Sequence, residues 1–242
     1  MKFYKKDSSN MSEIVSNSVQ LIVTSPPYPM IAKWDELFGC VDFEFQHRQL
    51  NQVWIECKRV LIEGGIACIN IGDATRTIKG RGFTCYPNYA KVVINMMNLG
   101  FIPLIPILWR KISNKPNSFL GSGFLPPNGY VTQEHEFIGI FRKGRLRKFP
   151  PKDRNRYASS FTHAERDNWF AQTWEIPGEK NAKKNSSFPR EIPSRLIKMF
   201  SVLGDVVLDP FCGIKTTMKV AEELGRIGIG YDIKRKGSEK ER

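Results

Sequence analysis

The chain has no long hydrophobic segment, and its first residues do not show the pattern of a signal sequence. None of its apolar runs approaches the ~20 residues that a membrane-spanning helix requires, and the opening residues, M-K-F-Y-K-K-D, lack the apolar core of a secretory signal. Internal repeats and long low-complexity tracts are also missing. We therefore expect a cytoplasmic protein without a membrane partner.

Metal-binding and disulfide patterns are missing as well. The five cysteines are scattered without a C-x-x-C pair, and the three histidines form no cluster beside them. This spacing predicts neither a zinc site nor a disulfide framework, so we expect no metal. The cysteines are expected to be small buried hydrophobic residues in a reducing compartment: Cys40, Cys57, Cys68, Cys85 and Cys212.

Acidic residues are few relative to basic ones. The 242 residues include 37 Lys and Arg against 24 Asp and Glu, for a net charge of +13. That excess favours a polyanionic partner, with nucleic acid as the first candidate. The alternative is a basic protein that its charge merely keeps in solution. The length and the 41% hydrophobic content fit one globular domain, or one domain with a small insertion.

The stretch T24-S-P-P-Y28 directly follows the apolar run 19–24. Pro26 and Pro27 fix the backbone and carry no N–H, so a strand ends here and a stiff loop begins. Such a loop leaves carbonyl oxygens available to a ligand, and Tyr28 offers a flat ring. These features suit a site that holds the exocyclic amine of a planar base. A Pro-Pro turn without such a role is the alternative.

A second motif, L208-D-P-F-C-G-I-K-T-T217, follows the apolar run that starts at Val206. A helix that ends at Gly225 is predicted to follow it. Strand, glycine turn and helix in this order form a ligand crevice at the carboxyl end of an α/β sheet. The next strand is expected to end at Asp232.

The two motifs together resemble the β group of DNA amino-methyltransferases. T-S-P-P-Y is similar to the family's catalytic motif (S/N/D)-P-P-(Y/F), and 208–217 is similar to its cofactor motif D-P-F-x-G-S-G-T-T, in the β-group order. The resemblance spans nearly the whole chain. It implies an α/β, Rossmann-like methyltransferase sheet that is mostly parallel, has an antiparallel edge hairpin, is circularly permuted and carries a small target-recognition insert. The permutation predicts that the first strand, K2-F-Y, pairs with the last.

The resemblance also implies S-adenosyl-L-methionine as the cofactor and assigns site residues. Asp232 would accept hydrogen bonds from the ribose hydroxyls, and Asp7 would bond the adenine, although Asp7 could equally be a solvated helix cap. The residues implied to hold and stack the target base are Ser25, Pro26, Pro27 and Tyr28. The residues implied to contact the cofactor are Asp7, Thr24, Ser186, Asp209, Pro210, Phe211, Gly213, Thr216, Thr217 and Asp232.

Lys215 departs from the family pattern, which usually has glycine at this position. A lysine with positive φ costs on the order of 1 kcal/mol. Its ammonium could approach the cofactor carboxylate or crowd the cofactor. We expect weakened but real cofactor binding, which the Lys215→Gly variant should tighten if crowding is the cause.

Periodicity predicts the remaining elements of the chain. Apolar residues at three- and four-residue steps predict a helix over 45–61, ended by Gly64 and Gly65, before a buried strand at 66–71. The other expectations are a brief helix after Asp7, a loop over 72–87, a helix over 89–99, and strands at 101–109 and 135–143 that pair as an edge hairpin.

The stretch 142–156 carries eight Lys or Arg residues and one acid, with aromatic residues after it. We expect it to contact DNA, the alternative being a solvated linker. It suggests three regions: a catalytic half at 1–142, a recognition insert at 143–178 whose start could lie as early as 111, and a cofactor half at 179–242. The candidate DNA-binding residues are Arg142, Lys143, Arg145, Arg147, Lys148, Arg154 and Arg156.

The predicted activity is methyl transfer to the N4 amine of cytosine in duplex DNA, because the resemblance to N4-cytosine enzymes is greatest at Ser25. N6-adenine methylation is the alternative, and an inactive DNA-binding subunit with the same fold is the second. The chain contains no Pro-Cys dipeptide, which argues against C5-cytosine methylation. Double-stranded DNA is the expected partner. A homodimer and a cognate restriction endonuclease are further partners that the resemblance suggests.

Overall fold

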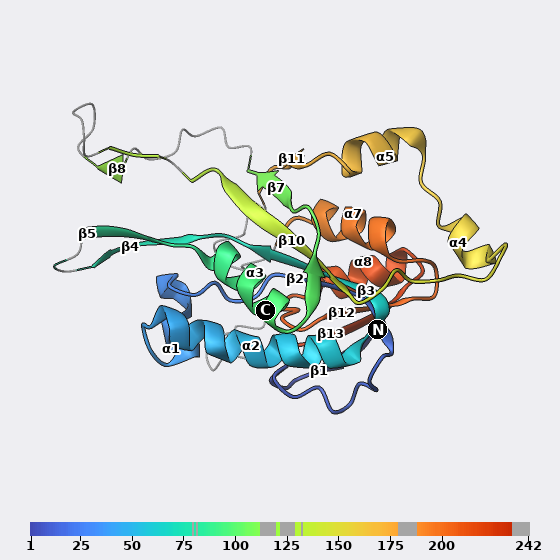
Figure 1. Ribbon diagram of the computed structural model, residues 1–242, viewed down its shortest axis with the longest axis horizontal. Coiled ribbons are helices and arrows are strands. Elements are labelled where there is room, and N and C mark those ends of the chain that lie inside the picture. Colours follow the sequence, from blue (N-terminus) through green and yellow to red (C-terminus); the bar gives the residue numbers. More distant parts are fainter. Residues whose placement is uncertain are drawn as a thin grey trace, which may run out of the picture.

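The computed structural model describes residues 1–78, 80, 82–111, 120–121, 129–131, 133–178 and 188–233. Within these residues the chain forms one nine-stranded sheet with helices on both faces (Figure 1). The strand order is β1-β13-β12-β2-β3-β10-β7-β11, and β6 pairs with β10 beside this path. These strands are β1 (Lys2–Tyr4), β13 (Ile227–Tyr231), β12 (Val206–Asp209), β2 (Val19–Thr24), β3 (Leu61–Ile71), β10 (His135–Lys143), β7 (Ile107–Arg110), β11 (Thr173–Glu175) and β6 (Phe101–Pro103).

The five strands from β1 to β3 are parallel, and β10 is antiparallel to β3 and β7. Strand β1 pairs in parallel with β13, with Phe3 opposite Gly230, so the predicted pairing of the first and last strands is confirmed. The mostly parallel, permuted sheet with an antiparallel edge is therefore the fold that the sequence predicts. Because five parallel strands end at the same edge, their carboxyl-terminal loops lie side by side there.

Two pairs of helices cover the sheet. Helices α2 (Phe43–Val60) and α3 (Asn88–Asn98) pack on one face with a cluster that includes Leu50, Trp54 and Met96. Helices α7 (Glu191–Phe200) and α8 (Thr216–Glu223) pack on the other face with Leu196 and Val220. The remaining described elements are η1 (Ala32–Trp34), α1 (Asp35–Phe38), α4 (Arg154–Ala158), α5 (His163–Trp169), β4 (Ala74–Ile78), β5 (Gly82–Tyr86), β8 (Leu120–Gly121) and β9 (Gly129–Tyr130). None of the helices in the described part of the chain is long and apolar enough to cross a membrane.

Helix α2 confirms the periodicity at 45–61, but its end was predicted wrongly. The Asp42 side chain caps it by accepting a hydrogen bond from the Phe45 N–H. The helix ends at Val60 and β3 begins at once, so Gly64 and Gly65 lie within the strand. Gly64 has φ of +77°, and an added Cβ would lie 2.3 Å from the Arg147 backbone nitrogen. This glycine serves the close approach of another chain segment instead of ending the helix.

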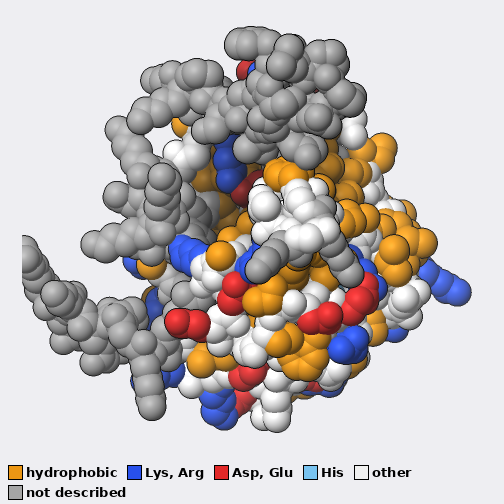
Figure 2. All heavy atoms as spheres, turned by 90° about the vertical axis from the view of Figure 1, so that its left-hand side faces the viewer, with side chains coloured by type: hydrophobic (Ala, Val, Ile, Leu, Met, Phe, Trp, Pro, Cys, Tyr) orange, Lys and Arg blue, Asp and Glu red, His pale blue; other side chains and the backbone are white. Residues whose placement is uncertain are grey.

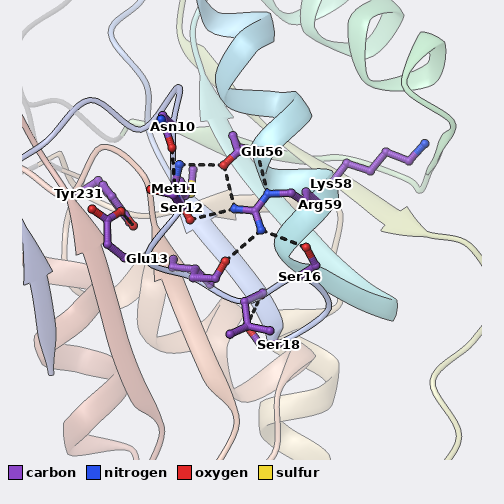
Figure 3. A network of polar contacts seen from close by, with 12 residues as sticks. Asn10, Met11, Ser12, Glu13, Ser16, Ser18, Glu56, Lys58, Arg59 and Tyr231 are labelled. Atoms are coloured by element: carbon purple, nitrogen blue, oxygen red, sulfur yellow. Dashed lines mark hydrogen bonds and ion pairs between the residues drawn. The ribbon is translucent and has the colours of Figure 1, made fainter.

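The segment between β1 and β2 forms turns, so the brief helix predicted after Asp7 is wrong. Arg59 of α2 holds this segment by donating to the Met11 and Ile14 carbonyls and to the Ser16 hydroxyl (Figure 3). Glu56 accepts from the Met11 N–H and pairs with Arg59. Side chains from α2 therefore satisfy the backbone groups that a helix would have paired internally.

The region 72–87 is not a loop, as its composition suggested, but the antiparallel hairpin β4–β5. The hairpin follows directly from the carboxyl end of β3 and extends beyond the sheet (Figure 1). Its strands face solvent on much of their surface, so polar and basic residues are compatible with pairing here.

The predicted strand at 101–109 is two short strands, β6 and β7, separated by residues that include Pro106. Both pair with β10, which confirms the antiparallel pairing, but β11 lies outside β7 in parallel register and forms the edge. Trp174 of β11 is 1% exposed, so part of the predicted 143–178 insert belongs to the main sheet and its core.

Candidate active site

The two sequence motifs meet at the carboxyl ends of β2 and β12. The Thr24 hydroxyl donates to Asp209 Oδ1 at 2.6 Å, which joins positions 185 residues apart. The same carboxylate oxygen accepts from the Phe211 N–H at 3.1 Å. Both Thr24 and Asp209 are buried. The loop after β2 (24–28) and the loop after β12 (209–215), which the sequence predicts to be the catalytic loop and the cofactor loop, therefore lie side by side.

Burial raises the pKa of Asp209 to about 6, and the nearby charge of Asp232 acts in the same direction. The hydrogen bonds from Thr24 and from the Phe211 N–H oppose this rise by favouring the ionised form. A buried carboxylate in this position is an electrostatic partner for a cationic ligand, and it is poised to change charge just below neutral pH.

The loop after β12 leaves room for a ligand on its solvent-exposed side. Gly213 is exposed with φ of +45°, and the first atom that an added Cβ would meet is Asp232 Oδ2 at 4.0 Å. Asp232 follows β13, and its N–H donates to the Tyr4 carbonyl of β1. Thr216 and Thr217 begin α8, and Pro210 is buried beneath the loop. An exposed glycine turn beside a carboxylate, above the buried Asp209, fits a cationic, diol-bearing cofactor.

For three of the implied cofactor residues, Phe211, Asp7 and Ser186, the structure gives no direct support for contact with a cofactor. The Phe211 ring packs edge-on against Trp54 of α2, with ring centroids 6.0 Å apart. Asp7 lies beyond β1 at the same sheet edge, is exposed, and accepts from the Ser9 N–H at 2.8 Å. Ser186 lies outside the described residues. The structure thus brings Thr24, Asp209, Gly213 and Asp232 together, while Asp7 caps a turn.

Tyr28 has more partners than a stacking role requires. Its hydroxyl lies 3.1 Å from Ser25 Oγ, donates to Glu136 Oε2 at 2.9 Å and accepts from Asn70 Nδ2 at 2.8 Å. Lys111 pairs with the other oxygen of Glu136. Burial and the charge of Glu136 raise the pKa of Tyr28 well above its ordinary value, so the phenol remains protonated. A hydrogen-bonded chain therefore runs from Ser25 to a carboxylate.

A second network fixes the catalytic loop from below. Asn88 Nδ2 donates to the Pro29 carbonyl at 3.0 Å and to the Gly72 carbonyl at 3.1 Å. Asn88 Oδ1 is an amide oxygen and can only accept, so His47 Nε2 carries a hydrogen and donates it to Asn88 Oδ1 at 3.0 Å. Neighbouring Gln46 accepts from the Met30 N–H. Two polar residues of α2 thereby hold the end of the loop against the end of β3.

His47 provides a test of this network. It is 0% exposed, and burial lowers its pKa from 6.5 to about 4. The unfolded chain then binds the proton more readily, so the free energy of unfolding contributed by His47 falls as the pH drops from 6.5 towards 4. The stability advantage of the wild type over His47→Gln should shrink by about 3 kcal/mol between pH 7 and pH 4, measured by urea unfolding.

The exposed His163 of α5 is the matched control, and His163→Gln should change stability equally at both pH values. Titration of Asp209 works in the opposite direction, but it is common to all three proteins and cancels in the comparison. A constant difference between wild type and His47→Gln across this range would contradict the burial of a neutral imidazole.

Lys215 adopts the left-handed conformation, with φ of 69°. Its ammonium lies over the Phe3 ring at 3.8 Å from the centroid, so the side chain reaches towards β1. This contact gives no support to crowding of the cofactor by Lys215.

We therefore expect Lys215→Gly to change cofactor affinity by less than about threefold. It should also change stability little, because relief of about 1 kcal/mol of backbone strain offsets a lost cation–π contact of similar size. Lys215→Ala keeps the strain, loses the contact and should be the less stable variant in urea unfolding. A large gain in affinity for Lys215→Gly alone would restore the crowding explanation.

The basic stretch 142–156 does not lie beside the catalytic loop, contrary to the expectation for a recognition insert. Arg142 pairs in register with Ile66, and the chain continues towards the amino ends of the parallel strands, where Arg147 forms an ion pair with the buried Asp205 at 2.6 Å. Lys143 donates to the Lys58 and Leu61 carbonyls. The Arg142 side chain donates to the Gly144 carbonyl at 3.0 Å, so three of the seven candidate DNA-binding side chains bond the protein itself and anchor this end of β10.

The other four candidates, Arg145, Lys148, Arg154 and Arg156, are exposed at that same end of the molecule. A cavity of about 590 Å³ lies there between this stretch and α7, and its lining includes Arg147, Phe149 and Lys198. Arg147 and Arg156 both stack on the Phe149 ring. The contacts of Arg147 and Arg156 therefore hold this stretch against the protein at a place away from Ser25 and Asp209.

Sequence reasoning missed Asn70, Glu136, Asn88 and His47. A signal was present for Asn70, which is a single polar residue within the apolar run I66-A-C-I-N-I71 and is 2% exposed. Glu136 is the second residue of β10, next to the polar His135, and gave no comparable signal. Its side chain is only 14% exposed, so its burial beside Tyr28 is visible only in the fold.

Comparison with known proteins gives consistent matches over nearly the whole chain. The family model described as DNA methylase matches residues 19–239. The type II methyltransferase M.MjaI of Methanocaldococcus jannaschii is 52% identical over 94% of this chain and 85% of its own length.

Solved structures agree with the sequence matches. TTHA0409 of Thermus thermophilus, in complex with S-adenosyl-L-methionine, has a TM-score of 0.79 and 31% identity over 96% of this chain and 89% of its own. PvuII DNA methyltransferase, described as cytosine-N4-specific, has a TM-score of 0.67 and 20% identity over 96% of this chain and 81% of its own, and at this identity shows a shared fold alone.

Proposed function

The chain belongs to the DNA methylase family, and from this premise we propose that it methylates the N4 amine of cytosine in duplex DNA. S-adenosyl-L-methionine is the methyl donor of such an enzyme. The observation that carries the proposal is the direct contact between Thr24 and Asp209, which places Ser25 one residue away from the cofactor loop. A methyl donor on that loop and an amine held by Ser25 would then be neighbours.

The residues present fit the cofactor in charge and shape. The buried Asp209 carboxylate offers negative charge, the carboxyl end of β13 offers Asp232 for a diol, and the Gly213 turn leaves the approach open. The cofactor supplies an activated methyl group on a positively charged sulfur. Orientation and proximity, which the stiff Pro26-Pro27 loop secures, carry most of the rate in a direct transfer of this kind.

The target base must leave the duplex to reach Ser25. Flipping costs a few kcal/mol, and stacking on the Tyr28 ring would return roughly 1 to 3 kcal/mol. Ser25 Oγ and the Pro26 carbonyl would accept hydrogen bonds from the amine. These bonds would localise the nitrogen lone pair, which is otherwise delocalised into the ring, and direct it at the methyl group.

The side chain at position 25 supports cytosine over adenine. T-S-P-P-Y resembles the motif of N4-cytosine enzymes, and PvuII methyltransferase, which shares the fold, is described as acting on cytosine N4. Adenine N6 methylation uses the same geometry and remains the alternative. An inactive DNA-binding subunit is the second alternative, and it would retain DNA without transferring methyl groups.

DNA is expected to approach the end of the molecule that carries the catalytic loop. The β4–β5 hairpin extends from this end, and Arg76 on it binds Asp35 and the Met30 carbonyl, which ties the hairpin to the catalytic loop. Figure 2 looks onto this end, where basic, acidic and hydrophobic side chains of the described residues are interspersed. We propose that the hairpin enters a groove of the duplex. The basic stretch 142–156, at the opposite end, is not proposed to read the same site.

The name of the M.MjaI relative supports a place in a type II restriction–modification system. A cognate endonuclease and a homodimer are part of that proposal.

The proposal is tested by incubating the protein with unmethylated genomic DNA and methyl-labelled S-adenosyl-L-methionine, then digesting the DNA to nucleosides. Label in N4-methyldeoxycytidine is the expected result. Label in N6-methyldeoxyadenosine would keep the mechanism and replace the target base. Retention of DNA without label would favour the inactive subunit.

A further inference from the structure

The direction of the hydrogen bonds around Tyr28 follows from the chemistry of its partners. Asn70 Nδ2 donates at 2.8 Å to the Tyr28 hydroxyl and at 2.8 Å to Glu136 Oε2. An ionised carboxylate only accepts, so the single hydroxyl hydrogen of Tyr28 points to Glu136. The Tyr28 oxygen must then accept from both Asn70 and Ser25.

This direction fixes what Ser25 can offer to a substrate. Its only hydroxyl hydrogen is donated to Tyr28 across 3.1 Å, so the lone pairs of Ser25 Oγ remain as acceptors. A base amine has N–H groups to donate. All these hydrogen bonds can therefore donate in one direction, from the amine to Ser25, from Ser25 to Tyr28 and from Tyr28 to Glu136.

Methyl transfer requires a proton acceptor. The C–S bond breaks, a C–N bond forms, and the amine nitrogen carries a positive charge until one N–H proton leaves. Ser25 is an alcohol, and burial together with the charge of Glu136 raises the pKa of Tyr28. Neither hydroxyl group can therefore be the final acceptor of the proton. A carboxylate two hydrogen bonds away can accept it.

We propose that Glu136 is the final acceptor of this proton. The amine N–H proton moves to Ser25 Oγ, the hydroxyl proton of Ser25 moves to Tyr28, and that of Tyr28 moves to the Glu136 carboxylate. Charge and atoms balance, and no oxidation occurs. Lys111, which pairs with Glu136 and whose side chain is 44% exposed, marks the solvent side from which the carboxyl group is deprotonated again. This inference rests on the proposed function.

The packing around Glu136 shows that its position is closely defined. A Cβ added to Gly72 would lie 3.1 Å from Glu136 Cγ and 3.3 Å from Tyr28 Cε2, so the backbone of Gly72 confines both side chains. The titratable groups that bond Glu136 are Lys111, at the end of β7, and Tyr28, after β2. Asn70, from β3, is neutral.

Replacement of Glu136 by glutamine removes the acceptor and keeps the size of the side chain. Single-turnover methyl transfer to DNA at saturating cofactor should fall about 100- to 10,000-fold, the range for loss of a positioned proton acceptor. Dissociation constants for S-adenosyl-L-methionine and DNA should change by less than about threefold. The wild-type rate should fall as the pH is lowered, and this acid limb should be missing in Glu136→Gln.

Glu134→Gln is the matched control, because Glu134 lies two residues away, is 40% exposed and pairs with Arg110. It should keep the wild-type rate and acid limb. Tyr28→Phe keeps the ring and breaks the relay, so it should slow transfer to a similar degree, and the double variant Tyr28→Phe/Glu136→Gln should be little slower than either single variant.

The inference is wrong if Glu136→Gln transfers methyl groups within about threefold of the wild-type rate. It is also wrong if the variant is slow but keeps the acid limb, or if Tyr28→Phe is fully active. A wild-type protein that binds cofactor and DNA but methylates no base would overturn the proposed function, and this inference with it. Failure of the relay alone would leave wild-type methylation intact.

Discussion

Replacing Ser25 by alanine is expected to lower the rate of methyl transfer about 100- to 1,000-fold, the usual effect of removing one group that stabilises a transition state. The Ser25 hydroxyl lies one residue after Thr24, which contacts Asp209 of the cofactor loop directly. Alanine removes this hydroxyl acceptor and the link to Tyr28. Cofactor binding should persist, since Ser25 makes no contact with the loop after β12 in the described hydrogen bonds.

The measurement is single-turnover transfer of labelled methyl to DNA, with cofactor binding followed by calorimetry. Ser160→Ala is a suitable control, because Ser160 is exposed at the opposite end of the molecule and should leave the rate unchanged. A Ser25→Ala protein that keeps most of its rate would show that the base amine is held elsewhere. Loss of cofactor binding would show instead that Ser25 belongs to the cofactor site.

Replacing Asp209 by alanine is expected to weaken S-adenosyl-L-methionine binding about 30-fold or more, which corresponds to about 2 kcal/mol. The variant loses the negative charge and leaves the Thr24 hydroxyl and the Phe211 N–H without their buried acceptor. Each unsatisfied group costs about 1 to 3 kcal/mol of stability. Asp209→Asn keeps an acceptor oxygen for both donors, so it should fold with near wild-type stability. Because it lacks the negative charge, its affinity for the cationic cofactor should still be reduced.

The raised pKa of Asp209 also predicts how cofactor affinity depends on pH. Its pKa of about 6 lies above the ordinary 3.8, so the carboxyl group becomes protonated as the pH falls through 6. Affinity for the cofactor should therefore fall by about tenfold between pH 7 and pH 5. Asp209→Asn should lose this dependence, and Asp167→Asn, a change at an exposed acid on α5, should keep it. An affinity that is constant with pH in the wild type would contradict a charge contact with Asp209.

The sequence identifies the two loops of the site because each follows an apolar strand and has an unusual local composition. T-S-P-P-Y stops β2, and the D-P-F-C-G turn links β12 to α8, so their positions follow from backbone chemistry alone. That both loops lie at one edge follows from the rule for parallel strands. The contact between Thr24 and Asp209 is a direct consequence of the order in which β2 and β12 lie in the sheet.

The polar support of the site could not be predicted in this way. His47 and Asn88 lie on helices whose periodicity indicates only which faces are buried, and their hydrogen bond forms between α2 and α3. Glu136 reaches Tyr28 because β10 runs antiparallel beside β3 and brings its first residues to the site. These contacts depend on the register between strands, which composition does not encode.

The basic stretch shows the opposite limitation. Composition correctly indicated that 142–156 has an exposed, charged surface, but it did not indicate which end of the sheet that surface occupies. The antiparallel direction of β10 carries the chain away from the catalytic loop, and Asp205 then fixes Arg147 there. Charge alone therefore led to a prediction of DNA contact for some residues whose side chains bond within the protein.

The most direct test of the proposed site is a crystal structure of the protein with duplex DNA that carries its methylation site and with a non-transferable analogue of S-adenosyl-L-methionine. We predict a cytosine outside the helix, its amine within hydrogen-bonding distance of Ser25 Oγ and the Pro26 carbonyl, and the cofactor analogue between Asp209 and Asp232. A target base whose amine lies away from Ser25, or a cofactor analogue bound elsewhere than the loop after β12, would contradict this prediction.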